Sequence, residues 1–234
     1  MLKFLNKKVG NLNYIENNSF KYTVGGEGDP IIVLHGLMGG LGNFKGFLEK
    51  FPDLGYQVFM PELPIYSASL LDTNVKFFAK YINTFIKKLG LKKVILVGNS
   101  LGGHVALVHA KLFPLNTKAL VLTGSSGLYE NAMGDTYPRR GDYDFIKNKT
   151  QNVFYSPEIA TKEVVDEVFE AVNDRRKVLK ILAVAKSAIR HNMAKDLPNI
   201  SIPTALIWGK NDEVTPPDVA NEFAQSFAPI PHAL

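Results

Sequence analysis

Ser100 lies in the stretch GNSLG, residues 98–102, which fits the pattern G-x-S-x-G. The apolar residues 94–97 before it predict a strand, and residues 101–113 after it predict a helix. A tight strand-to-helix turn forces such a serine into a strained backbone conformation, and the glycines let the two elements approach each other. The turn also puts the backbone N–H of Leu101 at a helix N-terminus, where developing negative charge is stabilised. The stretch predicts a nucleophilic serine; the alternative is a plain glycine-rich turn with a capping serine.

A second glycine-rich loop, residues 33–44, follows an early apolar run. An oxyanion beside a nucleophilic serine needs a second backbone donor from such a loop. His35-Gly36 followed by Leu37 matches this type of loop, so we assign the Leu37 N–H as that donor. We also expect His35, Gly36 and Asn99 to lie beside the substrate. The alternative is a phosphate-binding loop, but neither a Gly-Lys-Ser/Thr nor a G-x-G-x-x-G register fits.

A third motif, ALIWGKNDEVTPP at residues 205–217, places an acid in the loop after a strand. Asp212 is well placed to orient a histidine and to stabilise its imidazolium form. Alone, the residue would be an ordinary surface aspartate that starts a turn. Beside the other two motifs, it predicts a site in which Ser100 attacks a carbonyl, a histidine carries the proton and Asp212 orients that histidine.

The elements that must position these residues alternate along the chain between strand and helix. An edge hairpin is expected at 12–16 and 20–24, and Asp72 is expected to cap one helix. Buried strands are expected at 31–36, 57–63, 92–98, 117–124 and 204–209. Helices are expected at 43–51, 72–89, 101–113 and 216–227, the last with Pro216 in its first turn. This alternation predicts an α/β fold with a mostly parallel sheet and helices on both of its faces.

The alternation stops between about residues 125 and 200, where we find no convincing strand. Helical patterns cover 142–152, 161–172 and 174–195. We therefore expect a helical cap at 126–200, inserted into a core made of residues 1–125 and 201–234.

The composition limits the possible classes of protein. The chain has 234 residues, no cysteine and a formal charge of +5. No apolar run reaches the ~18 residues that span a bilayer, and we see no signal peptide. The basic residues are spread among acidic ones, without the stripe that nucleic-acid binding requires. We expect a cytoplasmic protein, monomeric or homodimeric, with a small-molecule substrate and neither a nucleic-acid nor a membrane partner.

Taken together, HGLMGG, GNSLGGHVAL, LVLTGSSGL and IWGKNDEVTPP resemble, in this order, the motifs of capped serine hydrolases with the α/β-hydrolase fold. The chain is similar in particular to meta-cleavage-product C–C hydrolases and to small carboxylesterases. The resemblance implies Ser100 as nucleophile, Asp212 as acid, and Leu37 and Leu101 as oxyanion donors. It implies neither a metal nor an organic cofactor.

The histidine base is the open point. The family places it last, after the acid, and His232 is the only histidine after Asp212. Two prolines, 229 and 231, precede His232 and oppose strand pairing. Three accounts are open: a shortened form of a longer hydrolase, which we favour; a complete chain in which His232 reaches the site; or a fold that keeps the pocket and only binds a ligand. We expect the remaining histidines to be packed in the structure or, for His191 in the cap, to contact substrate.

Several side chains of the expected cap could select the substrate. Apolar ones could line a pocket: Tyr129, Met133, Tyr137 and Phe145. Basic ones could pair with a substrate carboxylate, as a C–C hydrolase of dienoic acids would need: Arg139, Arg140 and Arg190. Packing and solvated faces explain both sets as well or better. The expected substrate is therefore a small, largely apolar ester, with C–C bond hydrolysis of a ketone as the second possibility.

Overall fold

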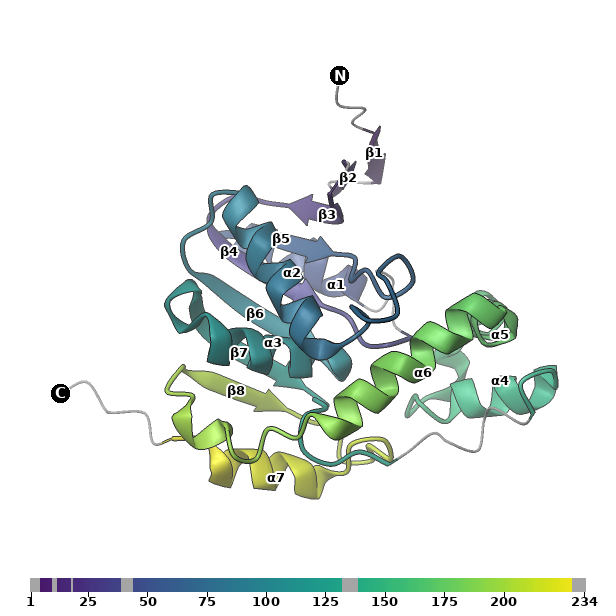
Figure 1. Ribbon diagram of the computed structural model, residues 1–234. Coiled ribbons are helices and arrows are strands. Elements are labelled where there is room, and N and C mark those ends of the chain that lie inside the picture. The colour runs from purple at the N-terminus through teal and green to yellow at the C-terminus, as the bar shows by residue number, and fades with distance from the viewer. Residues whose placement is uncertain (1–4, 10–11, 18, 39–43, 132–138, 229–234) are drawn as a thin grey trace.

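The computed structural model describes residues 5–9, 12–17, 19–38, 44–131 and 139–228, and within them one sheet organises the chain (Figure 1). Its eight strands lie in the order β1-β2-β3-β5-β4-β6-β7-β8. The pairs from β5 through β4, β6 and β7 to β8 are parallel, and those joining β1, β2, β3 and β5 are antiparallel. The strands are β1 Leu5–Val9, β2 Leu12–Glu16, β3 Lys21–Gly25, β4 Asp29–Leu34, β5 Tyr56–Pro61, β6 Val94–Asn99, β7 Thr117–Thr123 and β8 Thr204–Ile207. The predicted fold class is confirmed.

Both faces of the central strands are buried. Along β4, Ile32 and Leu34 belong to one apolar cluster, while Ile31 and Val33 belong to the other. The first cluster packs under α2 and α3, and the second packs under α1, as the period-two alternation of a strand requires. The helices that cover the two faces of the sheet are α1 Lys45–Lys50, α2 Val75–Lys88, α3 Leu101–Leu112 and, beside β8, α7 Pro217–Ser226.

Two predicted helix starts are wrong. The side chain of Asn74 caps α2, accepting a hydrogen bond from the Phe77 N–H at 2.9 Å. Asp72 lies in the turn before it and accepts from the Ser69 hydroxyl at 2.8 Å. At the other helix, Pro216 is the N-cap and Pro217 is the first helical residue. In both cases the apolar pattern located the helix. Its first residue was misplaced because a neighbouring polar or proline residue has a similar propensity to start a helix.

Three further helices lie between β7 and β8: α4 Tyr143–Gln151, α5 Lys162–Asn173 and α6 Arg175–Arg190. In Figure 1 they form a group beyond the ends of the strands, and α6 runs back toward β8. The Val75 N–H donates to the Ser187 hydroxyl at 3.3 Å, which ties α2 to α6. The helices fall where the sequence predicts them, except that the last ends at Arg190 and not at 195. The division into core and cap stays a prediction. No helix in the described part of the chain is long and apolar enough to cross a membrane.

Candidate active site

Ser100 occupies a strained turn between β6 and α3. Its φ is 51° and its ψ is −118°, and it is the only non-glycine residue with positive φ among the described residues. Such a conformation costs about 1–3 kcal/mol and persists only where its surroundings enforce it. Here the Ser100 N–H donates to the Thr123 carbonyl at 3.2 Å, and the Ser100 carbonyl accepts from the Ser126 N–H at 3.1 Å. Backbone bonds on both sides therefore fix the turn.

Glycines around Ser100 allow backbone to touch backbone. A Cβ on Gly98 would lie 2.5 Å from the Gly102 carbonyl oxygen, and a Cβ on Gly102 would overlap the carbonyl of Leu34. Real Cβ atoms do not come so close, so α3 can pack against β6 and β4 only without side chains at these positions. The pattern G-x-S-x-G is thus explained by packing, as predicted.

The loop after β4 lies against this turn. A Cβ on Gly36 would lie 3.5 Å from the Cβ of Ser100. The buried His35 ring accepts a hydrogen bond at Nε2 from the Leu63 N–H at 3.1 Å. Because Nε2 must then be unprotonated, the hydrogen sits on Nδ1, which donates to the Gly36 carbonyl at 2.8 Å. Burial lowers the pKa of His35 and keeps the ring neutral.

The His35 hydrogen bond fixes a peptide plane. The Gly36 carbonyl belongs to the same planar trans peptide as the Leu37 N–H, so the two point in opposite directions. Holding the carbonyl therefore holds the N–H that the sequence assigns to the oxyanion. Among the described residues, neither the Leu37 N–H nor the Leu101 N–H donates a hydrogen bond to a protein acceptor.

Asp212 lies in the loop between β8 and α7. Its Oδ1 accepts from the backbone N–H groups of Val214 and Thr215 at 2.9 and 2.8 Å, and its Oδ2 accepts from the Thr215 hydroxyl at 3.1 Å. A Cβ on Gly124, at the end of β7, would lie 2.9 Å from Oδ2. The acid therefore meets the end of β7, whose Thr123 is bonded to Ser100. The three predicted motifs gather at the carboxyl ends of β4, β6, β7 and β8, where open parallel sheets bind their ligands.

The Asn99 side chain has a role that the sequence did not indicate. Its Nδ2 donates to the carbonyl and the hydroxyl of Thr123, at 3.0 and 3.2 Å. The expected contact with substrate stays a prediction, and the observed contacts join β6 to β7 beside Ser100. Gly124, Ser126 and Thr215 also support the site. The sequence GSSG at 124–127 is the signal that could have pointed to two of them.

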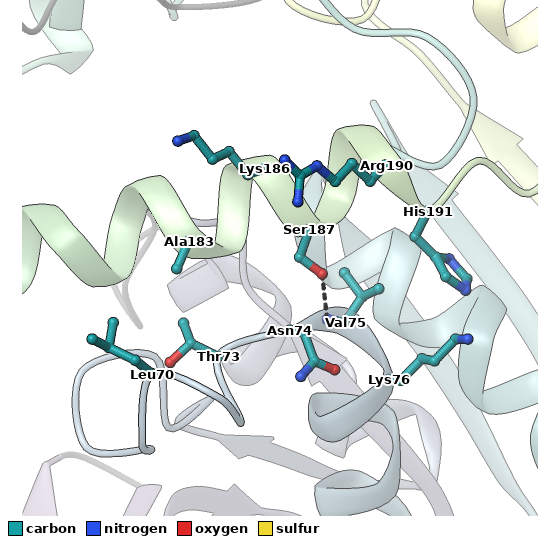
Figure 2. A pocket seen from close by; sticks show the side chains of 10 residues that line it. All are labelled: Leu70, Thr73, Asn74, Val75, Lys76, Ala183, Lys186, Ser187, Arg190 and His191. Atoms are coloured by element: carbon teal, nitrogen blue, oxygen red, sulfur yellow. Dashed lines mark hydrogen bonds between the residues drawn. The ribbon is translucent and has the colours of Figure 1, made fainter.

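Of two cavities in the described part of the chain, one borders the site. One, of about 360 Å³, is lined by Asp212 and its neighbours together with two side chains from beyond α4: Val153, Tyr155, Gly209, Lys210 and Asn211. The other, of about 480 Å³, lies between α2 and α6 and is lined in part by Arg190 (Figure 2). None of its lining residues belongs to the Ser100 turn, the His35 loop or the Asp212 loop. The structure thus brings Ser100, Gly36 and Asp212 into one region and leaves Arg190 in another.

None of the four described histidines forms a hydrogen bond with Ser100 or Asp212 among the described residues. Besides His35, Nε2 of His104 pairs with Nδ1 of His191 at 3.1 Å, and Nδ1 of His109 pairs with the Thr117 hydroxyl at 3.1 Å. His104 and His109 are buried, as expected for packed histidines. His232, the only candidate for the base after Asp212, lies outside the described residues.

The predicted substrate-selecting side chains are scattered. Tyr129 is exposed, and Phe145 lies under the Arg139 guanidinium at 4.2 Å. Arg139 itself pairs with Asp142 at 2.6 Å. Neither Tyr129 nor Phe145 lines a cavity named above. Met133 and Tyr137 lie outside the described residues.

Comparison with known proteins agrees with this geometry. The family model described as the alpha/beta hydrolase fold matches residues 29–234. The chain is 26% identical to a 2-hydroxy-6-oxononadienedioate/2-hydroxy-6-oxononatrienedioate hydrolase of a Pseudomonas species, over 93% of this chain and 82% of that one. It is 27% identical to Lipase 1 of Psychrobacter immobilis, over 83% of this chain and 65% of the lipase.

Among solved structures, MGS-MChE2, an alpha/beta hydrolase enzyme from the metagenome of Mar Chica lagoon sediments, is 48% identical, with a TM-score of 0.73. The match covers 96% of this chain and 85% of that one. The family match spans most of the chain, and the identity to a solved member is high. The chain therefore belongs to the α/β hydrolase fold family.

Proposed function

We propose that this hydrolase cleaves a small, largely apolar carboxylic ester through an acyl-enzyme on Ser100. The observation that carries the proposal is the positive φ of Ser100 in a turn packed against the His35–Leu37 loop. A strained serine without a hydrogen-bond partner for its hydroxyl among the described residues has no evident structural purpose. It has a chemical one, since the turn presents the hydroxyl at the end of the sheet.

The reaction proceeds in two halves. Oγ of Ser100 attacks the ester carbonyl while its proton passes to a histidine, and the tetrahedral oxyanion is held by the N–H groups of Leu37 and Leu101. Collapse of this intermediate expels the alcohol, which takes the proton back from the histidine. Water, deprotonated by the same histidine, then attacks the acyl-enzyme and releases the acid. Asp212 orients the imidazole and stabilises its charged form.

His232 is the one candidate for this histidine in the order of the family, because it is the only histidine after Asp212 in the sequence. A shortened chain that lacks its base stays the account that we favour. Support for His232 comes from its place after Asp212 in the sequence and from the cavity of about 360 Å³ that borders Asp212. A base must come within hydrogen-bond reach of both Ser100 and Asp212. An imidazole that enters this cavity would meet Asp212, whose Oδ2 has only the Thr215 hydroxyl as a hydrogen-bond donor among the described residues.

A second candidate is C–C bond hydrolysis of the meta-cleavage type. It is favoured by the dienoate and dienedioate hydrolases among the relatives. The same serine and oxyanion donors would serve a ketone substrate, but a dienoic acid also needs a cation near its carboxylate. Arg190, which the sequence suggested for this role, lines the other cavity, while Lys210 lines the cavity that borders Asp212. The ester stays the first substrate to test.

Active-site labelling tests the proposal. The full chain is incubated with a fluorophosphonate probe and weighed intact, with Ser100→Ala as the matched control. One adduct that the control lacks is expected, together with hydrolysis of short p-nitrophenyl esters. Asp212→Asn should slow both reactions, because the histidine loses its orienting partner.

The alternative outcome is also informative. No adduct on a folded chain, with or without added imidazole, would mean that Ser100 is not activated and that the chain is an incomplete hydrolase or a ligand-binding protein. Labelling that appears only with imidazole would mean that the elbow and oxyanion donors work and that His232 is not the base. The cytoplasmic location, the oligomeric state and the absence of nucleic-acid and membrane partners stay predictions.

A further inference from the structure

Two histidines join the helix that follows the nucleophile to the end of α6. Nε2 of His104 lies 3.1 Å from Nδ1 of His191, and the ring centroids are 5.3 Å apart. His104 is fully buried on α3, one turn after Ser100, and His191 is the half-buried C-cap of α6. Figure 2 shows the His191 ring pointing away from the end of α6, with the Lys76 side chain of α2 next to it. The pair has no place in the chemistry proposed above.

The position of the shared hydrogen follows from the second nitrogen of His104. Nδ1 of His104 is buried and finds no hydrogen-bond partner among the described residues. Unpaired N–H groups are rarer in protein interiors than unpaired acceptors. The favoured tautomer therefore has its hydrogen on Nε2 of His104, which donates to Nδ1 of His191. Neutral His191 then carries its own hydrogen on Nε2.

The pair lies beside the loop that fixes Ser100. The Met193 N–H, two residues past His191, donates to the Gly127 carbonyl at 2.7 Å. A Cβ on Gly127 would lie 3.5 Å from both the His104 ring and the Met193 side chain. The next residue back, Ser126, donates its N–H to the Ser100 carbonyl. The end of α6, the loop after β7 and the nucleophile turn thus form one continuous set of contacts.

We propose that His104 and His191 form a pH-sensitive clasp that holds the end of α6 on the nucleophile helix, and that protonation of His191 opens it. The added proton binds Nδ1 of His191, because Nε2 already carries a hydrogen. Two N–H groups then face each other, and the hydrogen bond between the rings is lost. The hydrogen of His104 then has only its contact with the His191 backbone, which partly offsets the lowering of the pKa of His104 by burial. To accept a hydrogen bond from the His191 ring, His104 would have to move its hydrogen to Nδ1, where no acceptor is found among the described residues. The effect on Ser100 rests on the proposed function, whereas the clasp itself does not.

The charges around His191 set the pH range. The charged residues that face or flank it are Lys76, Lys111, Arg190 and Asp196. Burial and then Lys76 lower the pKa of His191, while Asp196 opposes them. Asp196 is itself paired with Lys111 at 2.6 Å. Burial, with His191 adding to it, lowers the pKa of His104 to about 3, so this ring stays neutral while its partner titrates. The clasp is therefore present at neutral pH and is lost as the pH falls below the ordinary histidine pKa of about 6.5.

Hydrogen exchange of the full chain tests the clasp. The variant His191→Asn keeps an acceptor where Nδ1 was and cannot be protonated. Exchange of residues 186–193 and 125–131 is followed from pH 7.5 to 5, corrected for the intrinsic pH dependence of amide exchange. In the wild-type chain, the opening equilibrium should rise by up to about tenfold per pH unit once His191 protonates. In His191→Asn it should stay flat.

A second variant moves the transition without touching the clasp. Lys76 is exposed, so Lys76→Met is expected to fold. Removing its charge should raise the pKa of His191, read from the ring signals by NMR, and should shift the exchange transition to higher pH by the same amount. Equal pH dependence in wild type and His191→Asn, or protonation of His191 without loss of protection, would overturn the proposal.

The two proposals fail in different ways. The exchange readout does not require Ser100 to react. A clasp that opens as expected in a chain that no fluorophosphonate labels would leave the inference intact and reject the proposed chemistry. An active chain whose amide exchange does not depend on the protonation of His191 would support the proposed chemistry and reject the clasp.

Discussion

Replacing Ser100 by glycine should stabilise this protein while abolishing its proposed chemistry. The serine holds φ at 51°, a region that glycine enters about as readily as negative φ. Relief of the strain is worth about 1–3 kcal/mol. The greater conformational entropy of glycine in the unfolded chain lowers the stability of the folded state by about 0.4–1 kcal/mol. The lost hydroxyl adds nothing to this sum, because no hydrogen bond is found for it among the described residues.

The net gain should be about 1 kcal/mol, or a rise in Tm of about 2–4 °C for a chain of this size. Urea or thermal unfolding of wild type, Ser100→Gly and Ser100→Ala would measure it. Alanine is the matched control, because it removes the hydroxyl and keeps the Cβ that causes the strain. We therefore expect Ser100→Ala to unfold close to wild type. A glycine variant no more stable than the alanine variant would refute the argument that Ser100 is held against its own preference.

Two further substitutions follow from the contacts of the site, and a third follows from a buried histidine outside it. Gly102→Ala should lower the free energy of unfolding by about 3 kcal/mol or more, since its methyl group would overlap the Leu34 carbonyl; chemical denaturation measures this, and wild-type stability would contradict the packing argument. Thr215→Val removes a hydroxyl 3.1 Å from Asp212 and should slow ester cleavage about tenfold, with a loss of stability of about 1 kcal/mol; an unchanged rate in a pre-steady-state assay would remove Thr215 from the catalytic support. Burial lowers the pKa of His109 to about 4, so the unfolded chain binds more protons than the folded one between pH 6.5 and 4, and folding stability is lost as the pH falls through this range. His109→Gln should recover up to about 3 kcal/mol of that stability at pH 4. An acid-unfolding curve that the variant does not shift would exclude His109 as a cause of acid unfolding.

The local patterns of the chain were enough to predict the elements and the order of the site. Apolar periodicity located α2, and the run 94–97 predicted β6, because burial on a sheet or helix face leaves a direct trace in the sequence. The glycines around Ser100 predicted a close backbone approach, which the overlaps at Gly98 and Gly102 explain.

Contacts between distant segments could not be predicted in the same way. The bond between His104 and His191 joins residues 87 positions apart, and each histidine alone has the character of an ordinary packed side chain. The Asn99 amide is similar, since its partner Thr123 is known only once β6 and β7 are paired. First turns were also uncertain, as Asn74 and Asp72 show, because neighbouring residues have comparable capping propensity.

The pairing of β7 with β8 has a consequence for how this chain can change over evolutionary time. Leu122 lies opposite Leu206 in the parallel ladder, although the three helices α4 to α6 come between them in the sequence. The segment between β7 and β8 is therefore one long crossover connection, which must bring β8 back beside β7. The entropy of closing such a connection grows only with the logarithm of its length, about 0.6 kcal/mol per doubling. Changes in the length of α4 and α5 should therefore cost the strands little, whereas the end of α6, which packs into the main core and contacts the loop beside Ser100, has less freedom to change.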